Sequence, residues 1–165
     1  MPATEIRTGL NGSYATEYRL MLTLDEANRA IAAVLKHAHE QGYNVSVTVC
    51  DSLGHLIAHQ RMDGAFLKSS HGSIGKAIAA AGLGLPSGEE SDQDLRRSSV
   101  SLVLASGSPV IRRAGGLPIK RGEEVEGAIG VSGAPTNEQD EESARRGVEA
   151  LHLSTKKPRD SSSSR

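Results

Sequence analysis

The sequence lacks residues and segments that several classes of protein require. It has a single cysteine, Cys50, and no tryptophan. One cysteine excludes an internal disulfide framework and is typical of a reducing compartment. The first 20 residues lack the continuous apolar stretch of a signal peptide, and no later run is long enough to span a bilayer. We therefore expect a cytoplasmic protein with no membrane partner.

The chain also lacks an excess of charge of either sign. Its 19 basic and 20 acidic residues give a formal net charge of −1, which argues against nucleic acid as a partner. Aromatic side chains are scarce as well, at three tyrosines and one phenylalanine. The core must therefore come from Val, Ile, Leu and Ala and will be thin. Because small domains often gain stability by association, a homo-oligomer is expected.

The chain of 165 residues is long enough for one domain with a core of its own. Residues 1–19 are polar and aperiodic and are predicted to form a flexible arm. Residues 154–165 end in Asp-Ser-Ser-Ser-Ser-Arg, and this composition predicts a disordered tail. The folded domain is accordingly expected over residues 20–153.

Local patterns predict an α+β fold. Thr23 and Glu26 stand in capping-box spacing before an apolar stripe, and Gly42 follows it, so a helix is expected over 24–41. The other expected elements are a half-buried strand at 44–50, its hairpin partner at 55–62, a helix at 66–83, short strands at 109–113, 117–120 and 125–132, and a helix from 137. Residues 100–105 are compatible with strand or helix. This order predicts an antiparallel sheet with helices packed on it.

Three groups of motifs occur together in one order. They are Val47-Thr-Val-Cys-Asp-Ser-Leu-Gly-His-Leu56 with Gln60-Arg-Met-Asp-Gly-Ala65; Gly75-Lys-Ala77 with Gly84-Leu-Pro86; and Gly115-Gly-Leu-Pro-Ile119 with Gly127-Ala-Ile-Gly-Val-Ser-Gly133, Gln139-Asp-Glu141 and Ala144. In order and spacing they resemble the GlcG/HbpS-like family, also called the haem-degrading domain family, over roughly residues 20–152.

The resemblance implies a profilin-like antiparallel sheet flanked by helices and a homo-oligomer. Characterised relatives are described as haem-binding or haem-degrading, so haem is the cofactor that the resemblance implies. A similar domain is attached to corrinoid adenosyltransferases of the PduO type. The activities of the family are heterogeneous, and the fold alone does not assign one to this chain.

Arg61 and Asp63 follow the end of an expected strand. An arginine there can bind a carboxylate or a haem propionate through two parallel hydrogen bonds. Alternatively, the two side chains form an ion pair that fixes the loop before the next helix. The two interpretations stand side by side, and the family motif keeps cofactor binding by Arg61 and Asp63 among them.

Three residues are candidates for catalysis: Lys76, His71 and Asp140. Lys76 lies among alanines, where it either extends to solvent from a helix edge or is partly desolvated for anion binding or amine chemistry. The family motif at Lys76 favours a role in a pocket. His71 is a candidate general base or axial ligand for haem iron, although an exposed first-turn histidine is the simpler interpretation. Asp140 stabilises a helix N-terminus and, if it reaches the pocket, is a candidate acid–base group.

The glycine-dense segments around Gly116 and Gly130, with Ser132, can expose backbone amides to a cofactor, or can simply form tight turns. Ser132 is not in a Gly-x-Ser-x-Gly elbow, so it is not predicted to be a nucleophile. The spacing of the six histidines does not predict a closed zinc site. Relatives typically carry threonine shortly after the Lys-Ala motif, where this chain has Ile78-Ala-Ala80, so a hydroxyl near the cofactor is missing.

Two functional hypotheses follow, besides a structural oligomer without chemistry of its own. The first is a haem-binding protein, with or without haem-degrading activity. The second is an enzyme of the isomerase, lyase or hydrolase type that acts on a small carboxylated or enolisable metabolite. In it Arg61 would bind the carboxylate, and Lys76, His71 or Asp140 would move protons.

Overall fold

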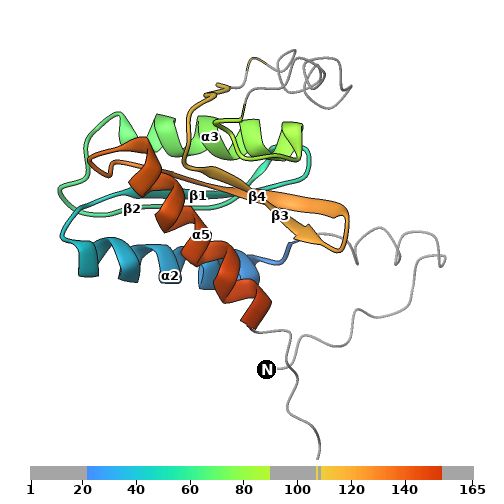
Figure 1. The fold of residues 1–165 in the computed structure, drawn as a ribbon, viewed down its shortest axis with the longest axis horizontal. Helices are drawn as coiled ribbons and strands as arrows, with labels where there is room; N and C mark the ends of the chain where they lie inside the picture. The colour runs from blue at the N-terminus through green and yellow to red at the C-terminus, as the bar shows by residue number, and fades with distance from the viewer. Residues whose placement is uncertain (1–21, 90–106, 108, 154–165) are drawn as a thin grey trace, which may run out of the picture.

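The computed structural model describes residues 22–89, 107 and 109–153. These residues form three layers, with a sheet in the middle (Figure 1). Helix α3 (Ser69–Leu83) covers one face, and α2 (Leu24–Gln41) and α5 (Asn137–Leu153) cover the other. The predicted α+β architecture, an antiparallel sheet flanked by helices, is confirmed. The predicted arm, the tail and the segment 100–105 lie outside the described residues.

The sheet has four strands: β1 (Ser46–Asp51), β2 (Leu56–Arg61), β3 (Gly116–Arg121) and β4 (Glu124–Ser132). Their order is β2-β1-β4-β3, and every neighbouring pair is antiparallel. Two hairpins, β1–β2 and β3–β4, therefore join through their β1 and β4 strands. β2 and β3 form the edges.

The predicted strand at 109–113 is wrong, because this segment is irregular. Its Ile111 N–H donates to the carbonyl of Gly75 in α3 at 3.0 Å, so its backbone pairs with a helix rather than with a strand. Pro109 has no N–H to contribute to a ladder. Within the described residues the sheet therefore has four strands, where the sequence pattern indicated five.

Helix α2 has the predicted bounds because both of its ends are capped. The Thr23 hydroxyl accepts from the Glu26 N–H, and the Glu26 carboxylate accepts from the Thr23 N–H, which satisfies donors that the first helical turn leaves free. At the other end Gly42 adopts φ +78°, a left-handed conformation that favours glycine.

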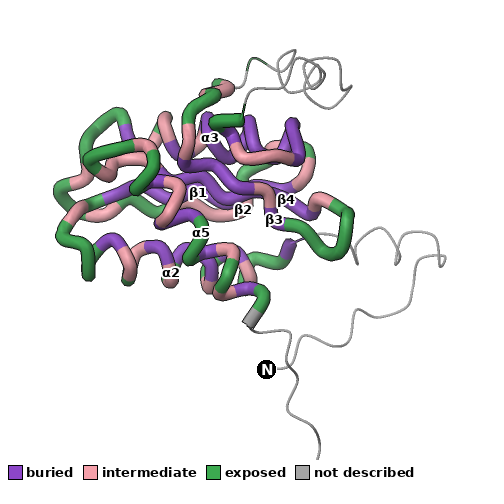
Figure 2. Tube along the Cα trace, in the orientation of Figure 1, coloured by how far each residue is buried: buried purple, intermediate pink, exposed green. Residues whose placement is uncertain are grey.

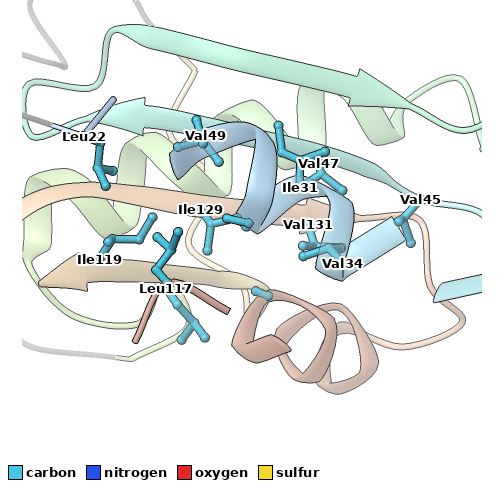
Figure 3. Close-up of a cluster of buried hydrophobic side chains, with 14 of the residues drawn as sticks. Leu22, Ile31, Val34, Val45, Val47, Val49, Leu117, Ile119, Ile129 and Val131 are labelled. Carbon is cyan, nitrogen blue, oxygen red and sulfur yellow. The ribbon is translucent and has the colours of Figure 1, made fainter. Parts of the chain in front are cut away.

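The main hydrophobic core lies between the sheet and the helices α2 and α5 (Figure 3). It is made of aliphatic side chains, and the largest that are fully buried are Ile31, Val34, Val45, Val47, Val49, Ile129 and Val131. The tube in Figure 2 shows the same pattern, with the buried residues concentrated in the sheet and on the inner sides of the helices. Alternate residues of β1 point into this core, as their spacing predicted.

The opposite face of the sheet differs in chemistry. Ser46, Thr48 and Cys50 alternate with the valines of β1 and point towards α3, yet every residue of β1 is buried. The prediction of a half-buried strand is therefore wrong, because α3 covers the polar side of β1 as well. The apolar cluster here is small and consists of Cys50, Ala77, Ala80, Ala81 and Ala128.

Helix α3 starts later than predicted. It begins at Ser69, and the expected helical residues Phe66 and Leu67 lie before it with 67% and 78% of their surface exposed. A helix over 66–83 would place Leu67 on its inward, apolar side, and the exposure of Leu67 shows that this interpretation is wrong. None of the helices in the described ranges has the length and apolarity needed to cross a bilayer.

Candidate functional site

Lys76 is buried in α3 and forms an ion pair that joins helices on opposite faces of the sheet. Its Nζ lies 2.7 Å from Oδ2 of Asp140 in the first turn of α5, and 3.2 Å from Oδ1 of Asn137. The side chains of Lys76 and Asp140 expose only 3% and 5% of their surface. Lys76 therefore does not extend to solvent. Of the two interpretations that the sequence left open for this lysine, the structure supports the desolvated one.

Two glycines make room for this ion pair. A Cβ on Gly115 would lie 2.8 Å from Nζ of Lys76 and 2.9 Å from Cβ of Asp140, and its φ of +124° also favours glycine. A Cβ on Gly116 would meet the backbone of Lys76 and the hydroxyl of Ser87, and the Gly116 N–H donates to that hydroxyl at 2.8 Å. The amide of Gly116 is thus engaged within the protein.

The carboxylate of Asp140 is fully engaged. Oδ2 accepts from Lys76, and Oδ1 accepts from the Ala134 N–H at 2.9 Å. Burial raises the pKa of Asp140 above its ordinary value, while the hydrogen bond and the positive charge of Lys76 act in the opposite direction. Two of the three predicted catalytic residues, Lys76 and Asp140, therefore lie together, but each is the ion-pair partner of the other.

An open cleft of about 450 Å³ lies beside this ion pair. It is lined by Pro86, Gly88, Glu89, Arg113, Ala114, Asn137, Glu138 and Glu141. Asn137 connects the cleft to the ion pair, because it lines the cleft and also accepts a hydrogen bond from Lys76. A small polar molecule in the cleft would meet Arg113 and the carboxylates and would reach Lys76 only through Asn137.

A second polar cluster lies between the sheet and the first half of α3. Oγ of Ser46 lies 2.7 Å from Oγ of Ser69, and Oγ1 of Thr48 lies 2.8 Å from Oγ of Ser73. Oγ1 of Thr48 also contacts Nδ1 of His59 on β2 at 2.9 Å. These residues were not among the predicted site residues. The signal was present in the alternation of β1, whose polar positions face α3.

His59 and Arg61 lie at the edge of this polar cluster. In the register of the hairpin they pair with Thr48 and Ser46, and Leu56 pairs with Cys50 beyond a register shift in the ladder. Ile57 and Ala58 both pack on the main core, so the side chains of Leu56, His59 and Arg61 point to the α3 side of the sheet. Helix α3 packs on β1, β4 and β3 and makes at most marginal contact with β2. The residues that the structure describes therefore leave the α3 side of β2 largely uncovered: Leu56 and Arg61 are exposed, and His59 is half-buried.

The environment of His59 keeps its ring neutral. Partial burial lowers the pKa of His59 below its ordinary value, and the positive charge of Arg61 lowers it further. A neutral imidazole can ligate a metal or accept a proton, which an imidazolium cannot.

The other predicted site residues are dispersed. His71 is exposed on α3, and Asp63 is exposed in the loop after β2. Among the described residues no ion pair joins Arg61 to Asp63, so the interpretation of this motif as a loop-fixing pair gains no support. The roles of His71, Asp63 and Arg61 remain predictions.

Gly130 and Ser132 lie on β4. Gly130 is buried, and a Cβ there would collide with the Ser73 carbonyl and the Ala77 N–H of α3. Its lack of a side chain therefore lets the helix lie close to the sheet. Ser132 is half-buried at the end of β4, in register with Ser46. Their predicted contact with a cofactor is not tested by this geometry.

No group of three His, Cys, Asp or Glu side chains that could hold a metal ion occurs within the ranges that the structure describes. Cys50 is buried, and burial, with a smaller contribution from the charge of Asp51, raises the pKa of its thiol to about 12. The thiolate needed for ligation is therefore not formed near neutral pH. A metal that arrives within an organic cofactor needs only one protein ligand, and the half-buried imidazole of His59 can supply one.

Comparisons with known proteins agree with the motifs. The family model described as haem degrading protein HbpS-like matches residues 22–149. Protein GlcG of Escherichia coli K12 is 31% identical over 115 residues, which are 69% of this chain and 83% of GlcG. The crystal structure of HbpS superposes with a TM-score of 0.67 at 31% identity, covering 79% of this chain and 90% of HbpS. That of the PduOC–haem complex gives 0.66 at 25% identity, covering 79% and 94%. The chain belongs to the HbpS-like haem-degrading protein family.

Proposed function

We propose that this protein binds haem or a closely related tetrapyrrole. The family description and the relative crystallised as a haem complex support this class of ligand. The observation in this chain that carries the proposal is the uncovered α3 side of β2, where Leu56, His59 and Arg61 point the same way. An apolar contact, a neutral imidazole and a guanidinium thus lie in a row on one strand.

The residues of this surface fit the chemistry of haem. A porphyrin presents a broad apolar face, an iron atom that accepts imidazole nitrogen, and two propionates that pair with arginine. Leu56 is 60% exposed, and Phe66 and Leu67, in the loop that leads from β2 to α3, are also exposed. These side chains supply apolar surface that the scarcity of aromatic residues in the sequence did not predict. When bound, haem would supply redox and oxygen chemistry; the chain would bind it, orient it and limit its contact with water.

Assembly is part of the proposal. Large apolar side chains exposed in the loop before α3 and on β2 favour association of copies of the chain, because exposed apolar surface is commonly covered by a partner. We propose a homo-oligomer in which a bound tetrapyrrole is partly enclosed by a second copy. Light scattering after size exclusion, with and without haemin, measures the mass of the particle. A monomer under both conditions would contradict this part of the proposal.

A second candidate function rests on the cleft beside Lys76. Its lining combines Arg113 with carboxylates and with Asn137, which suits a small polar metabolite better than a porphyrin. In this alternative, Asp140 and Lys76 act as a proton reservoir behind Asn137, and the chain is an enzyme of the isomerase, lyase or hydrolase type. A thermal-shift screen of small carboxylic acids tests it. Stabilisation that Asn137→Ala abolishes and Arg61→Ala retains would favour this enzyme.

The experiment that tests tetrapyrrole binding is a haemin titration of the full chain, followed by visible spectroscopy. We expect saturable binding with a shifted Soret band. Arg61→Ala should weaken binding on the order of tenfold or more, since charge-assisted hydrogen bonds contribute about 1.5–3 kcal/mol. Arg145→Ala is the matched control, because Arg145 is an exposed arginine on α5, on the other face of the sheet. Absence of saturable binding by the unmodified chain would refute the proposal.

A further inference from the structure

A chain of hydroxyl groups fixes the ring of His59. Oγ of Ser73 donates to the carbonyl of Ser70 at 3.0 Å. Oγ of Ser73 also lies 2.8 Å from Oγ1 of Thr48, and Oγ1 of Thr48 lies 2.9 Å from Nδ1 of His59. Thr48 and Ser73 are almost completely buried, so bulk water has little access to their hydroxyl groups.

Counting protons along this chain gives each bond a direction. A hydroxyl has only one proton to donate. Ser73 donates its proton to the carbonyl of Ser70, so it can only accept from Thr48. Thr48 has then used its proton and can only accept from His59. Nδ1 of His59 must therefore carry the hydrogen.

The other ring nitrogen, Nε2, is then left as a bare acceptor. A neutral imidazole has one N–H, and the position of His59 beside Arg61 and its partial burial favour the neutral ring. No hydrogen bond found between described residues involves Nε2 of His59. Histidines that ligate a metal commonly have one nitrogen held by a hydrogen bond while the other faces the metal.

Among the described residues, no such chain of hydrogen bonds fixes the ring of His71. It lies two residues after Ser69 and two before Ser73, both of which face the sheet. At 100° per helical residue it therefore lies on the opposite, exposed side of α3. His59 instead lies on the same side of β2 as Arg61, two residues and roughly 7 Å away along the strand.

We propose that His59 is the axial ligand of the iron in the bound tetrapyrrole, that it binds through Nε2, and that Thr48 and Ser73 are its positioning residues. This inference rests on the proposed function and replaces His71 as the ligand. Arg61, farther along the same strand, binds a carboxylate at the edge of the macrocycle. The two residues thus fix both the iron and the orientation of the ring.

The test compares haemin with metal-free protoporphyrin IX on the full chain. His59→Gln keeps a side-chain N–H for Thr48 but removes the imidazole. We expect it to weaken haemin binding at least tenfold and to shift the Soret and visible bands. Binding of metal-free protoporphyrin should stay unchanged, because that ligand has no iron. His71→Gln is the matched control and should leave both titrations unchanged.

Two further measurements address the hydroxyl chain itself. Nitrogen-15 NMR of the ligand-free protein should report His59 as the neutral Nδ1–H tautomer. Thr48→Val is close in shape to the native residue but cannot accept from Nδ1, so it should weaken haemin binding on the order of tenfold. It should also increase the fraction of the other tautomer. A His59→Gly variant should recover its native haemin spectrum when free imidazole is added.

The outcomes separate the two claims. If the unmodified chain binds neither haemin nor protoporphyrin, the proposed function fails and this inference fails with it. If the chain binds haemin and His59→Gln binds it with the same affinity and spectrum, only this inference is overturned. A His59 ring that carries its hydrogen on Nε2 in the ligand-free protein would likewise overturn the ligand geometry.

Discussion

The two faces of the sheet are built from different chemistry, although the same strands supply both. Towards α2 and α5, β1 presents valines to an aliphatic core. Towards α3, the same strand presents Ser46, Thr48 and Cys50, and their partners are hydroxyls and alanines. Burial of aliphatic surface is the main source of stability in a small domain. Buried hydroxyls add little net stability, so their value lies in fixing the positions of side chains.

This difference assigns separate roles to the two layers. The face covered by α2 and α5 contains the main hydrophobic core, whereas on the α3 face a hydroxyl chain orients His59, and we propose that β2 binds the ligand there. Lys76 is the exception, because its ion pair with Asp140 connects α3 to α5. Substitutions on the two faces should therefore change different observables.

The largest effect on stability is expected from breaking the link between the layers. Lys76→Met leaves Asp140 buried without its cation, and removal of one partner of a buried ion pair typically costs about 3–5 kcal/mol. Urea unfolding measures this loss. The double variant Lys76→Met with Asp140→Leu should recover most of it, since no buried charge remains. A single variant as stable as the native chain would show that the ion pair does not join the layers.

The aliphatic face should be the next most sensitive. Ile129 is fully buried in the main core, and Ile129→Ala should reduce the free energy of unfolding by about 2–5 kcal/mol through lost burial and a cavity. Thr48→Val, on the opposite side of the sheet, should change it by much less while altering haemin binding. Equal destabilisation by the two substitutions would contradict the division of roles.

Disturbing the close packing of α3 on the sheet should have a smaller effect on stability. Gly130→Ala places a methyl group against the Ser73 carbonyl and the Ala77 amide, and overpacking of this kind typically costs about 1–3 kcal/mol. Because Ser73 would be displaced, haemin binding should weaken as well. Ala32→Gly, on the exposed side of α2, is a control that reduces stability through helix propensity alone, by about 1 kcal/mol. An unchanged haemin affinity in Gly130→Ala would contradict this expectation, because it would show that the packing of α3 on the sheet does not affect the ligand surface.

The smallest expected effect is a dependence of stability on pH. The pKa of His59 is lowered in the folded protein, so the unfolded chain binds the proton first as the pH falls. The contribution of His59 to stability should be constant above about pH 6.5, the ordinary pKa of histidine, and should be lost as the pH falls through the folded pKa. His59→Gln should flatten this decrease in thermal unfolding experiments, and His71→Gln should not. An identical pH profile for all three proteins would contradict the environment assigned to His59.

Local signals in the sequence predicted much of the fold. The bounds of α2 follow from Thr23, Glu26 and Gly42, because caps depend on neighbouring residues only. The predicted strand at 109–113 failed because an extended, apolar segment does not reveal whether its backbone partner is a strand or a helix. The family motifs nevertheless predicted the overall fold correctly.

The site was predicted less completely. Lys76 was a candidate on its motif, but its burial depends on Asp140, which lies 64 residues later in the chain. His59 was not singled out, because the orientation of its ring depends on its pairing with Thr48 across the hairpin and on Ser73 in α3. Both facts concern contacts between elements, and local sequence patterns do not report such contacts.

The most direct test of the difference between the faces is an NMR titration with haemin. Paramagnetic iron broadens the signals of nearby residues, so the affected amides locate the ligand. We predict that broadening will be concentrated in β2, in the loop 62–68 and in the first half of α3. Broadening centred instead on the groove between α2 and α5, which His37, Lys36 and Arg146 help to line, would contradict the assignment of ligand binding to the α3 face.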